Sequence, residues 1–355
     1  ARAGIAESEA EKLYAEAAKH FAQKELFDLK PLVEKLKTAY PNTRPVTDEA
    51  RKPPFSEMAK ATETLGKFIT VRQDGKGDFT SIQAAIDAAP ANSLIEIQDS
   101  ATYYEKVIIP PAAKGLVLRG RKGSWPVISS RMPDRRYNYL VSVQAPDVSM
   151  EGMIITHCAP PEGHAYENAA IHVGAAHLRL RSSLAYAFNG LAVYSFRETQ
   201  AEACVLMGPQ WGVFTSHAPL TATNCLMIGR GGGDGGMKLR LSVLTGKLNS
   251  GKQPTTAIDS VIGQVQAVPD LQPSVEHCVL SGSPPYVGET KPGKNCIIAD
   301  PQFRDPDNLD YRLKPTSPCR KKASDGGDIG CRFTPEMIEL LEKALELRKK
   351  GIIKF

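Results

Sequence analysis

The chain has 355 residues, of which 42% are hydrophobic and 23% charged, as is typical of a folded soluble protein. No apolar stretch approaches the roughly 20 residues that a membrane-spanning helix needs, and residues 1–12 mix acidic and small side chains, unlike a signal peptide. The formal net charge of +5 is compatible with an acidic polymer as partner, although a solvated surface explains it more simply. There are 7 cysteines but no C-x-x-C pair, which argues against a zinc site and against a full disulfide framework.

Residues 5–40 predict two helices, because apolar residues recur in both halves at helical spacing. The pattern L-Y-x-x-A-x-x-x-F, followed by a second helix that ends in Y-P-N, resembles one tetratricopeptide-type helical hairpin. Such a hairpin cannot bury its own face alone, so we expect it to pack on the following domain or to end a longer helical array. The proline-rich residues 41–66 predict a linker with one short helix near 56–64. The apolar positions are Leu13, Tyr14, Ala17, Ala18 and Phe21, then Leu29, Leu32, Val33, Leu36 and Tyr40.

From Lys67 onward the pattern becomes β-rich. Thr80-Ser81-Ile82-Gln83 resembles a capping box at the start of a helix over residues 82–89. Short runs rich in β-branched residues, separated by Gly, Pro, Asn and Asp, predict the strands. They lie at residues 68–71, 94–97, 106–109, 116–118, 127–129 and 139–143.

Five later segments, centred on Met153, Ser183, Cys204, Cys225 and Cys278, align without gaps near their centres. The spacing from Ser183 to Cys204 is 21 residues, and from Cys204 to Cys225 it is 21 again. A period of this length, made of short strands and turns, is typical of a β-solenoid in which equivalent residues stack. We therefore interpret the cysteines as an internal stack of small apolar residues.

Residues 229–273 interrupt this repeat in the sequence and predict a loop excursion that could form one wall of a groove. The run 231–236 is too rich in glycine for a strand, and it lacks the Lys-Ser or Lys-Thr pair of a phosphate-binding loop. Residues 299–330 resemble the ends of bacterial β-helices. An amphipathic helix over 334–349 then follows, and we expect it to cover the open end of the solenoid.

The fold class that we predict is all-β: a right-handed single-stranded parallel β-helix with a short N-terminal helical segment and a C-terminal helix. The predicted divisions are a helical hairpin and linker at 1–66, the β-helix at 67–332 and a capping helix at 333–355. Residues 77–90, 103–110 and 116–120 resemble the beginning of pectin methylesterases and related pectin-lyase-like proteins. That superfamily contains lyases, hydrolases, esterases and non-enzymes, so the resemblance implies the fold and not the activity. By analogy of fold it also favours an extracytoplasmic or cell-surface location.

The resemblance allows the esterase chemistry to be tested residue by residue. Pectin methylesterases use two aspartates whose pKa values are pushed apart, each placed seven residues after a stacked core cysteine. Seven residues after Ser183 and Cys204 stand Gly190 and Trp211, and the oxyanion-binding glutamine falls at or near Asn168. Neither Gly190 nor Trp211 can attack a carbonyl or transfer a proton, so esterase activity is disfavoured.

A calcium-dependent lyase needs clustered carboxylates, and a glycosidase needs two or three acids close together. Acidic residues are sparse along 150–230, and Asp234, Asp259 and Asp270 are scattered over the irregular stretch. The run 162–167 contains Glu162, His164 and Glu167, but its spacing does not match a metal site. We therefore predict no metal and no cofactor.

A polar and aromatic set remains on the face that holds the catalytic residues in the esterases, and it suits sugar stacking with hydrogen bonds. The first hypothesis is a β-helix that binds a polysaccharide, with acidic polysaccharides as the candidate partners, and that lacks esterase activity. The second is a divergent polysaccharide lyase or hydrolase whose acids come from 229–273. The third is a scaffold that binds a protein partner through its N-terminal helices; no nucleic acid partner is expected. The candidate ligand-binding residues are Asn168, His172, Asn189, Tyr194, Gln210, Trp211 and His217.

Overall fold

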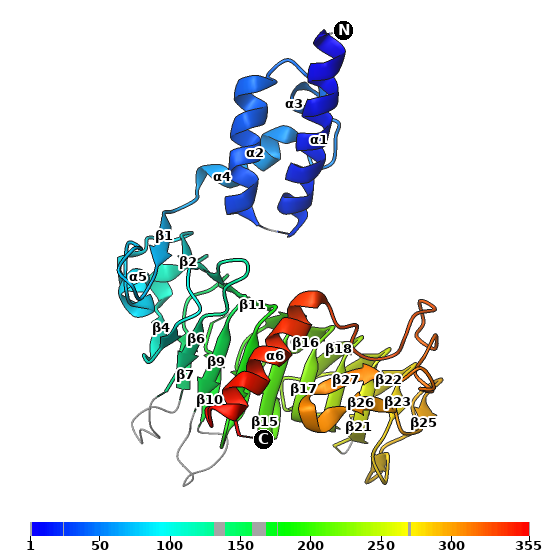
Figure 1. Cartoon of the computed structure of the whole chain (residues 1–355). Helices are drawn as coiled ribbons and strands as arrows, with labels where there is room; N and C mark the ends of the chain where they lie inside the picture. The colour runs from blue at the N-terminus through cyan, green and yellow to red at the C-terminus, as the bar shows by residue number, and fades with distance from the viewer. Residues whose placement is uncertain are drawn as a thin grey trace. The chain divides into compact units, whose positions relative to one another are not determined.

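The computed structural model describes residues 2–23, 25–130, 139–157, 168–175, 177–268 and 271–354, except for the side chains of residues 2, 3, 209 and 210. The chain forms two compact units, one made of residues 1–68 with 90–94 and one made of residues 69–89 with 95–355 (Figure 1). Each is described by itself below. Within the described part of the chain, no helix is both long and apolar enough to cross a membrane.

The helical unit contains α1 (Arg2–Gln23), α2 (Leu26–Ala39), α3 (Arg44–Thr47) and α4 (Phe55–Glu63). Phe55 and Met58 of α4 are buried against the hairpin, so the unit has its own hydrophobic core. The short helix expected near 56–64 is confirmed as α4, whereas the expectation that the hairpin must be covered by another domain or repeat is wrong. The physical reason is that α4 presents a second apolar stripe to the groove between α1 and α2. The other buried core residues are Ala10, Tyr14, Ala17, Leu29, Val33 and Leu36.

The second unit is a parallel β-solenoid, as predicted, and its first sheet has ten strands stacked in chain order. All the pairings along this sheet that involve β5 to β22 are parallel. The strands are β1 (Phe68–Val71), β2 (Leu94–Ile97), β5 (Val117–Gly120), β8 (Ser149–Glu151), β11 (Leu178–Arg181), β14 (Thr199–Glu202), β16 (Leu220–Thr223), β18 (Met237–Arg240), β20 (Thr256–Ile258) and β22 (Ser274–Glu276).

The remaining parallel strands form two further faces, because four long strands bend at a corner and contribute to both. The second sheet contains β3 (Thr102–Tyr103), β6 (Val127–Ser129), β9 (Ile154–His157), β12 (Leu184–Ala187), the first parts of β15 (Val205–Thr215), β17 (Leu226–Gly232), β19 (Val243–Asn249) and β21 (Val261–Gln266), then β23 (Val279–Leu280) and β25 (Ile297–Ile298). The third sheet contains β4 (Val107–Ile109), β7 (Tyr139–Val143), β10 (Ala169–Val173), β13 (Leu191–Ser195), the later parts of the four long strands, and β24 (Tyr286–Val287). The strands β17 to β21 run through residues 229–273, so the predicted loop excursion is wrong.

A column of small side chains inside the solenoid confirms the stacking that the repeat predicts. Each member directly precedes a strand of the second sheet, and the register Ile154–Leu184–Val205–Leu226 places the members one above another. The residue before each member has a positive φ, for example 54° at Asn224, which turns the chain from the first sheet into the second. The column is Met153, Ser183, Cys204, Cys225, Ser242, Ser260, Cys278 and Cys296.

A ladder of glycines explains the glycine-rich sequence that resembled a loop. At the corner between the second and third sheets each glycine lies directly against the backbone of the preceding coil. A Cβ atom on Gly229 would lie 2.2 Å from the carbonyl oxygen of Gly208, and one on Gly246 would lie 2.4 Å from that of Gly229. Only glycine allows coils to approach this closely, so the residues belong to a tight corner and not to an excursion.

The start of the solenoid is covered by α5 (Ile82–Ala88), whose Ile82, Ala85 and Ile86 are buried in the main core. Its N-cap is Ser81, which accepts a hydrogen bond from the Ala84 amide at 3.2 Å, so the capping box expected from Thr80 is wrong. The Glu105 carboxylate also accepts from the Ile82 and Gln83 amides, and it therefore caps this helix from another coil.

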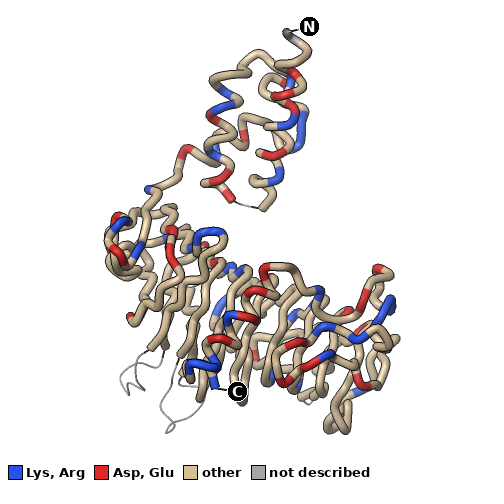
Figure 2. Tube along the Cα trace, viewed as in Figure 1, with Lys and Arg blue, Asp and Glu red and all other residues tan. Residues whose placement is uncertain are grey.

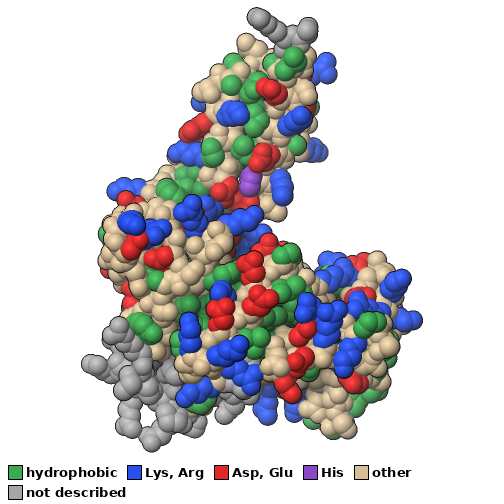
Figure 3. All heavy atoms as spheres, in the orientation of Figure 1, with side chains coloured by type: hydrophobic (Ala, Val, Ile, Leu, Met, Phe, Trp, Pro, Cys, Tyr) green, Lys and Arg blue, Asp and Glu red, His purple; other side chains and the backbone are tan. Residues whose placement is uncertain are grey.

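The last helix lies along the outer face of the second sheet. The prediction that it covers the open end of the solenoid is therefore wrong. Figure 1 shows α6 (Pro335–Lys349) crossing these strands, and Leu340 and Ala344 are buried against their outward side chains. The Trp125 indole donates to the Glu339 carboxylate at 3.1 Å, which fixes the helix to an early coil. The strands carry apolar residues on both faces, so their outer face needs this cover. The covered residues include Val127, Ile154, Leu184, Val205, Leu226, Val243, Val261 and Val279. Charges of both signs mix on the exposed side of α6 (Figures 2 and 3).

Candidate functional site

The strand register brings aromatic side chains together on the outer face of the third sheet. His172 of β10 pairs with Tyr194 of β13, and Tyr194 pairs with Phe214 of β15. The preceding positions Ile171, Val193 and Val213 are buried in the core, so the three rings point outward. We call the half-buried or exposed residues Tyr139, His172, Tyr194, Phe196, Phe214 and His217 the aromatic face.

These rings contact one another from coil to coil. Tyr139 stacks on His172, with centroids 4.1 Å apart and an interplanar angle of 10°. Tyr194 lies 4.6 Å from Phe196 and 5.6 Å from Phe214, and Phe196 stacks on His217 at 5.5 Å. Aromatic pairs of this kind contribute about 0.5–1.5 kcal/mol each beyond area burial, so the rings hold each other in place. The result is a rigid, amphipathic surface several coils long.

Trp211 packs beside this surface, next to Phe214. It is 8% exposed and forms a buried cluster with Ala169 and Leu191, the residues at the same level in the two preceding coils. Its ring meets Phe214 edge to face at 5.3 Å. Because its own face is covered, Trp211 orients Phe214 and presents little surface to a ligand.

Basic and amide side chains continue the same face into later coils. Arg230 pairs with Trp211, and its guanidinium lies 6.0 Å from the centre of the indole ring. Since Gly231 pairs with Leu248, Arg230 and Lys247 occupy the same level of neighbouring coils, and Lys247 pairs with Gln264. None of the described third-sheet strands contains Asp or Glu, so within that part of the chain the face carries positive and neutral groups only.

Two histidines near this face, His172 and His157, are neutral at ordinary pH. Burial lowers the pKa of His172, and its Nδ1 is buried without a hydrogen-bond partner. His157, at the end of β9, is 3% exposed, and burial with the nearby Lys106 lowers its pKa to about 4. A neutral imidazole can accept a hydrogen bond and can stack as an aromatic ring.

The other predicted residues lie at the edge of the face or outside the described side chains. Asn168 is buried at the corner before β10, and its carbonyl accepts from the Leu191 amide at 2.9 Å. Asn189 is half-buried at the corresponding corner of the next coil, just before β13. The side chain of Gln210 lies outside the described residues. The structure thus gathers His172, Tyr194 and His217 on one face, and Trp211 is buried beside them against Phe214.

Four residues of this face were not predicted from the sequence: Tyr139, Phe196, Phe214 and Arg230. Trp211 pairs with Leu191, the eighth residue after Ser183 and not the seventh, because the offset between the two coils changes from 21 residues at Tyr186–Met207 to 20 residues at Leu191–Trp211. Counting seven residues from both Ser183 and Cys204 therefore compares Gly190 with Trp211, although the residue that pairs with Trp211 is Leu191. Aromatic residues alternating with buried aliphatic ones in β13 and β15 were the available signal.

Two of the three scattered aspartates of residues 229–273 have structural partners. The Asp234 carboxylate accepts from the Lys252 ammonium at 2.7 Å, and the buried Asp259 accepts from the amide and hydroxyl of Ser324, both at 2.6 Å. Asp259 thereby anchors the C-terminal segment to the solenoid. Asp270, and the run 162–167, lie outside the described residues.

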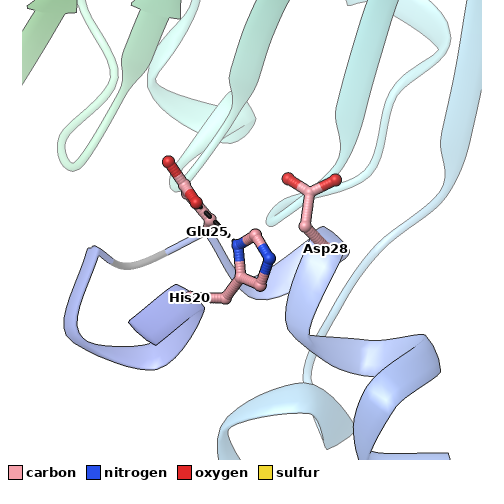
Figure 4. Close-up of side chains that lie close together, drawn as sticks. All are labelled: His20, Glu25 and Asp28. Carbon is pink, nitrogen blue, oxygen red and sulfur yellow. Dashed lines mark hydrogen bonds and ion pairs between the residues drawn. The ribbon is translucent and has the colours of Figure 1, made fainter. Parts of the chain in front are cut away.

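In the helical unit, His20, Glu25 and Asp28 lie close together at the turn between α1 and α2 (Figure 4). Their ligand atoms are all within 4.8 Å of one another, and the His20 Nδ1 is 2.7 Å from the Glu25 carboxylate. The His20–Glu25 bond joins the last turn of α1 to the first residue before α2. Donors of this kind can hold a divalent cation, and the same contact also serves to fix the turn between two helices.

No family model and no curated protein matches the sequence. Among solved structures, the chain is similar to the pectate lyase Pel9A, with 11% identity and a TM-score of 0.51 over 75% of this chain and 96% of that one. A pectin methylesterase from carrot is 17% identical, with a TM-score of 0.39 over 60% and 72% of the two chains. One from Aspergillus niger is 15% identical, with a TM-score of 0.43 over 64% and 84%. Together with the stacked parallel coils, the likeness to Pel9A shows that this chain has the pectin-lyase-like right-handed parallel β-helix fold.

Proposed function

We propose that this protein binds an acidic polysaccharide along the outer face of the third sheet and has no pectin methylesterase activity. The observation that carries the proposal is the continuity of the aromatic face with Arg230 and Lys247 on stacked coils. Sugar rings present an apolar face that packs on aromatic rings, while carboxylates pair with cationic side chains. A polymer lying along the solenoid axis meets both kinds of group in order. The names of the pectate lyase and the pectin methylesterases indicate pectin-type polymers as the first to test.

The chemistry of the face also favours binding over turnover. Esterase and glycosidase mechanisms of this kind need two carboxylates close together, and calcium-dependent lyases need clustered carboxylates. The described third-sheet strands supply neither, and the described acids Asp234 and Asp259 are bound to Lys252 and Ser324. Because the strands of this face, as far as the structure describes them, offer no carboxylate to attack or to hold an ion, we expect a bound uronate polymer to be retained and not converted.

Calorimetric titration of the full chain with polygalacturonate, methyl-esterified pectin and a neutral glucan tests the binding. We expect polygalacturonate to bind best and its affinity to fall with added salt, because the cations on this face are screened. Arg230→Ala should weaken binding, whereas Lys238→Ala, which removes an exposed cation on the first sheet, should not. Tyr194→Leu keeps apolar volume and removes the ring, so it should also weaken binding.

The two rival functions give different results in the same series. Release of methanol, reducing ends or unsaturated products by the wild-type chain would identify an enzyme and contradict the proposal. Absence of binding to every polymer, with loss of a protein interaction when residues 1–66 are deleted, would favour a scaffold instead. Binding that is equal for wild type, Arg230→Ala and Tyr194→Leu would place the ligand on another surface.

A further inference from the structure

The last two members of the internal column are cysteines in directly adjacent coils. Cys278 precedes β23 and Cys296 precedes β25, and the register pairs Val279 with Ile297. The Ile297 amide donates to the Cys278 carbonyl at 2.9 Å. Neighbouring strands lie about 4.8 Å apart, which falls within the roughly 4.4–6.8 Å between Cα atoms that a disulfide spans.

The two sulfur atoms occupy the space between these coils. The Cys296 Sγ lies 3.5 Å from the Lys294 carbonyl of its own coil and 3.6 Å from the Val275 carbonyl of the coil below. The Cys278 Sγ lies 3.2 Å from the Glu276 carbonyl, and the Cys278 side chain is close enough to Cys296 to lower the pKa of that thiol. The register therefore places the two side chains at equivalent positions of adjacent coils, where a disulfide would join neighbouring strands.

Access and acidity distinguish this pair from the other stacked cysteines. Cys204, Cys225 and Cys278 are buried, whereas Cys296 is half-buried, and β25 is the terminal strand of its sheet. The hydrogen bond from Cys278 lowers the pKa of Cys296 to about 7, with the Tyr286 hydroxyl also contributing. Burial raises the pKa of Cys331, the other half-buried thiol among the cysteines that the structure describes. Cys296 is therefore the thiol from which reaction with an oxidant is expected to start.

We propose that Cys278 and Cys296 form a redox-active dithiol that closes to a disulfide and cross-links the last two coils. With hydrogen peroxide as oxidant, the Cys296 thiolate attacks one peroxide oxygen and gives a sulfenic acid, and the leaving hydroxide takes a proton to become water. The Cys278 thiol then attacks the sulfenic sulfur, and a second water leaves. In sum, two thiols and one peroxide give one disulfide and two waters. The new bond closes the loop 278–296, which contains β24, and restrains the end of the solenoid that α6 does not cover.

Mass spectrometry of the full chain tests this site. The reduced protein is treated with hydrogen peroxide, its remaining thiols are alkylated, and tryptic peptides are analysed. We expect one intramolecular cross-link, between Cys278 and Cys296, with the fully buried Cys204 and Cys225 still reduced. Oxidation should also raise the unfolding temperature of the chain.

Serine variants separate the steps. Serine already stands at positions 183, 242 and 260 of the column, so Cys278→Ser and Cys296→Ser should fold. In Cys278→Ser, oxidation should stop at a Cys296 sulfenic acid that a dimedone probe traps. Cys296→Ser should form no cross-link, and Cys331→Ser should form the same cross-link as wild type. A Cys204–Cys225 cross-link that forms at the same rate, or a wild-type Cys296 that stays a trappable sulfenic acid, would overturn the proposal.

Discussion

The glycine ladder at the corner between the second and third sheets makes a sharp prediction for Gly246→Ala. The new Cβ atom would lie 2.4 Å from the carbonyl oxygen of Gly229, 2.6 Å from its carbonyl carbon and 3.0 Å from the Arg230 amide nitrogen. All three are backbone atoms, so no side chain can rotate away. Contacts of about 3.5 Å are normal for such atoms, and the two coils must therefore separate locally by about 1 Å.

That separation stretches the parallel hydrogen bonds between β17 and β19 on either side of the corner. Overpacking costs about 1–3 kcal/mol, and each ladder hydrogen bond that is weakened costs up to about 1 kcal/mol more. We expect a loss of about 3–4 kcal/mol in the free energy of unfolding of the solenoid. For a domain of this size that corresponds to a fall of about 6–8 °C in Tm.

Gly174→Ala is the matched control, because the atoms nearest to its added Cβ, in His172 and Val143, lie at an ordinary 3.5 Å. This change should be neutral or slightly stabilising, since alanine restricts the unfolded chain. Urea unfolding and calorimetry of both variants give the comparison. If Gly246→Ala unfolds within about 0.5 kcal/mol of Gly174→Ala, the coils are not in the close contact that the ladder requires.

Three further changes test other parts of the structure. Burial lowers the pKa of His157 to about 4, whereas a histidine in the unfolded chain titrates near 6.5. Because the unfolded state binds the proton first, about 3 kcal/mol of stability should be lost as pH falls from 6.5 to 4. Urea titrations should show a weaker pH dependence of stability in His157→Asn. Leu340→Ala removes a fully buried side chain of α6 and should cost about 2–5 kcal/mol, whereas Glu342→Ala on the exposed side should change little; equal calorimetric effects would show that α6 is not packed on the sheet. Met58→Ala should destabilise the helical unit by a similar amount, about 2–5 kcal/mol, and leave the amides of the solenoid protected, as hydrogen exchange would measure. An unchanged helical unit would show that α4 is only a linker.

The sequence alone determined the solenoid, because its coils repeat a local pattern. Small residues recur at a spacing of 21, as at Ser183, Cys204 and Cys225, and each stands where the chain turns into the second sheet. Stacking of equivalent positions follows from such a repeat, since every coil packs mainly on its neighbours. The helix that begins after Thr334 was also predictable, because its cap and apolar stripe lie within one short segment.

Tertiary structure decided the features that depend on contacts between distant residues. The sequence around Gly229 and Gly246 is compatible with a loop and with a tight corner. Only the neighbouring coil distinguishes the two, because a Cβ atom on Gly246 would lie 2.4 Å from the Gly229 carbonyl oxygen. The position of α6 depends on the apolar outer face of the second sheet, which no local pattern links to residues 335–349. The aromatic face depends on register: the offset between the two coils changes by one residue between the pair Tyr186–Met207 and the pair Leu191–Trp211, and this also aligns Phe214 with Tyr194. Side chains alternate along a strand with a period of two, so a single shifted residue decides which rings meet on the outer surface.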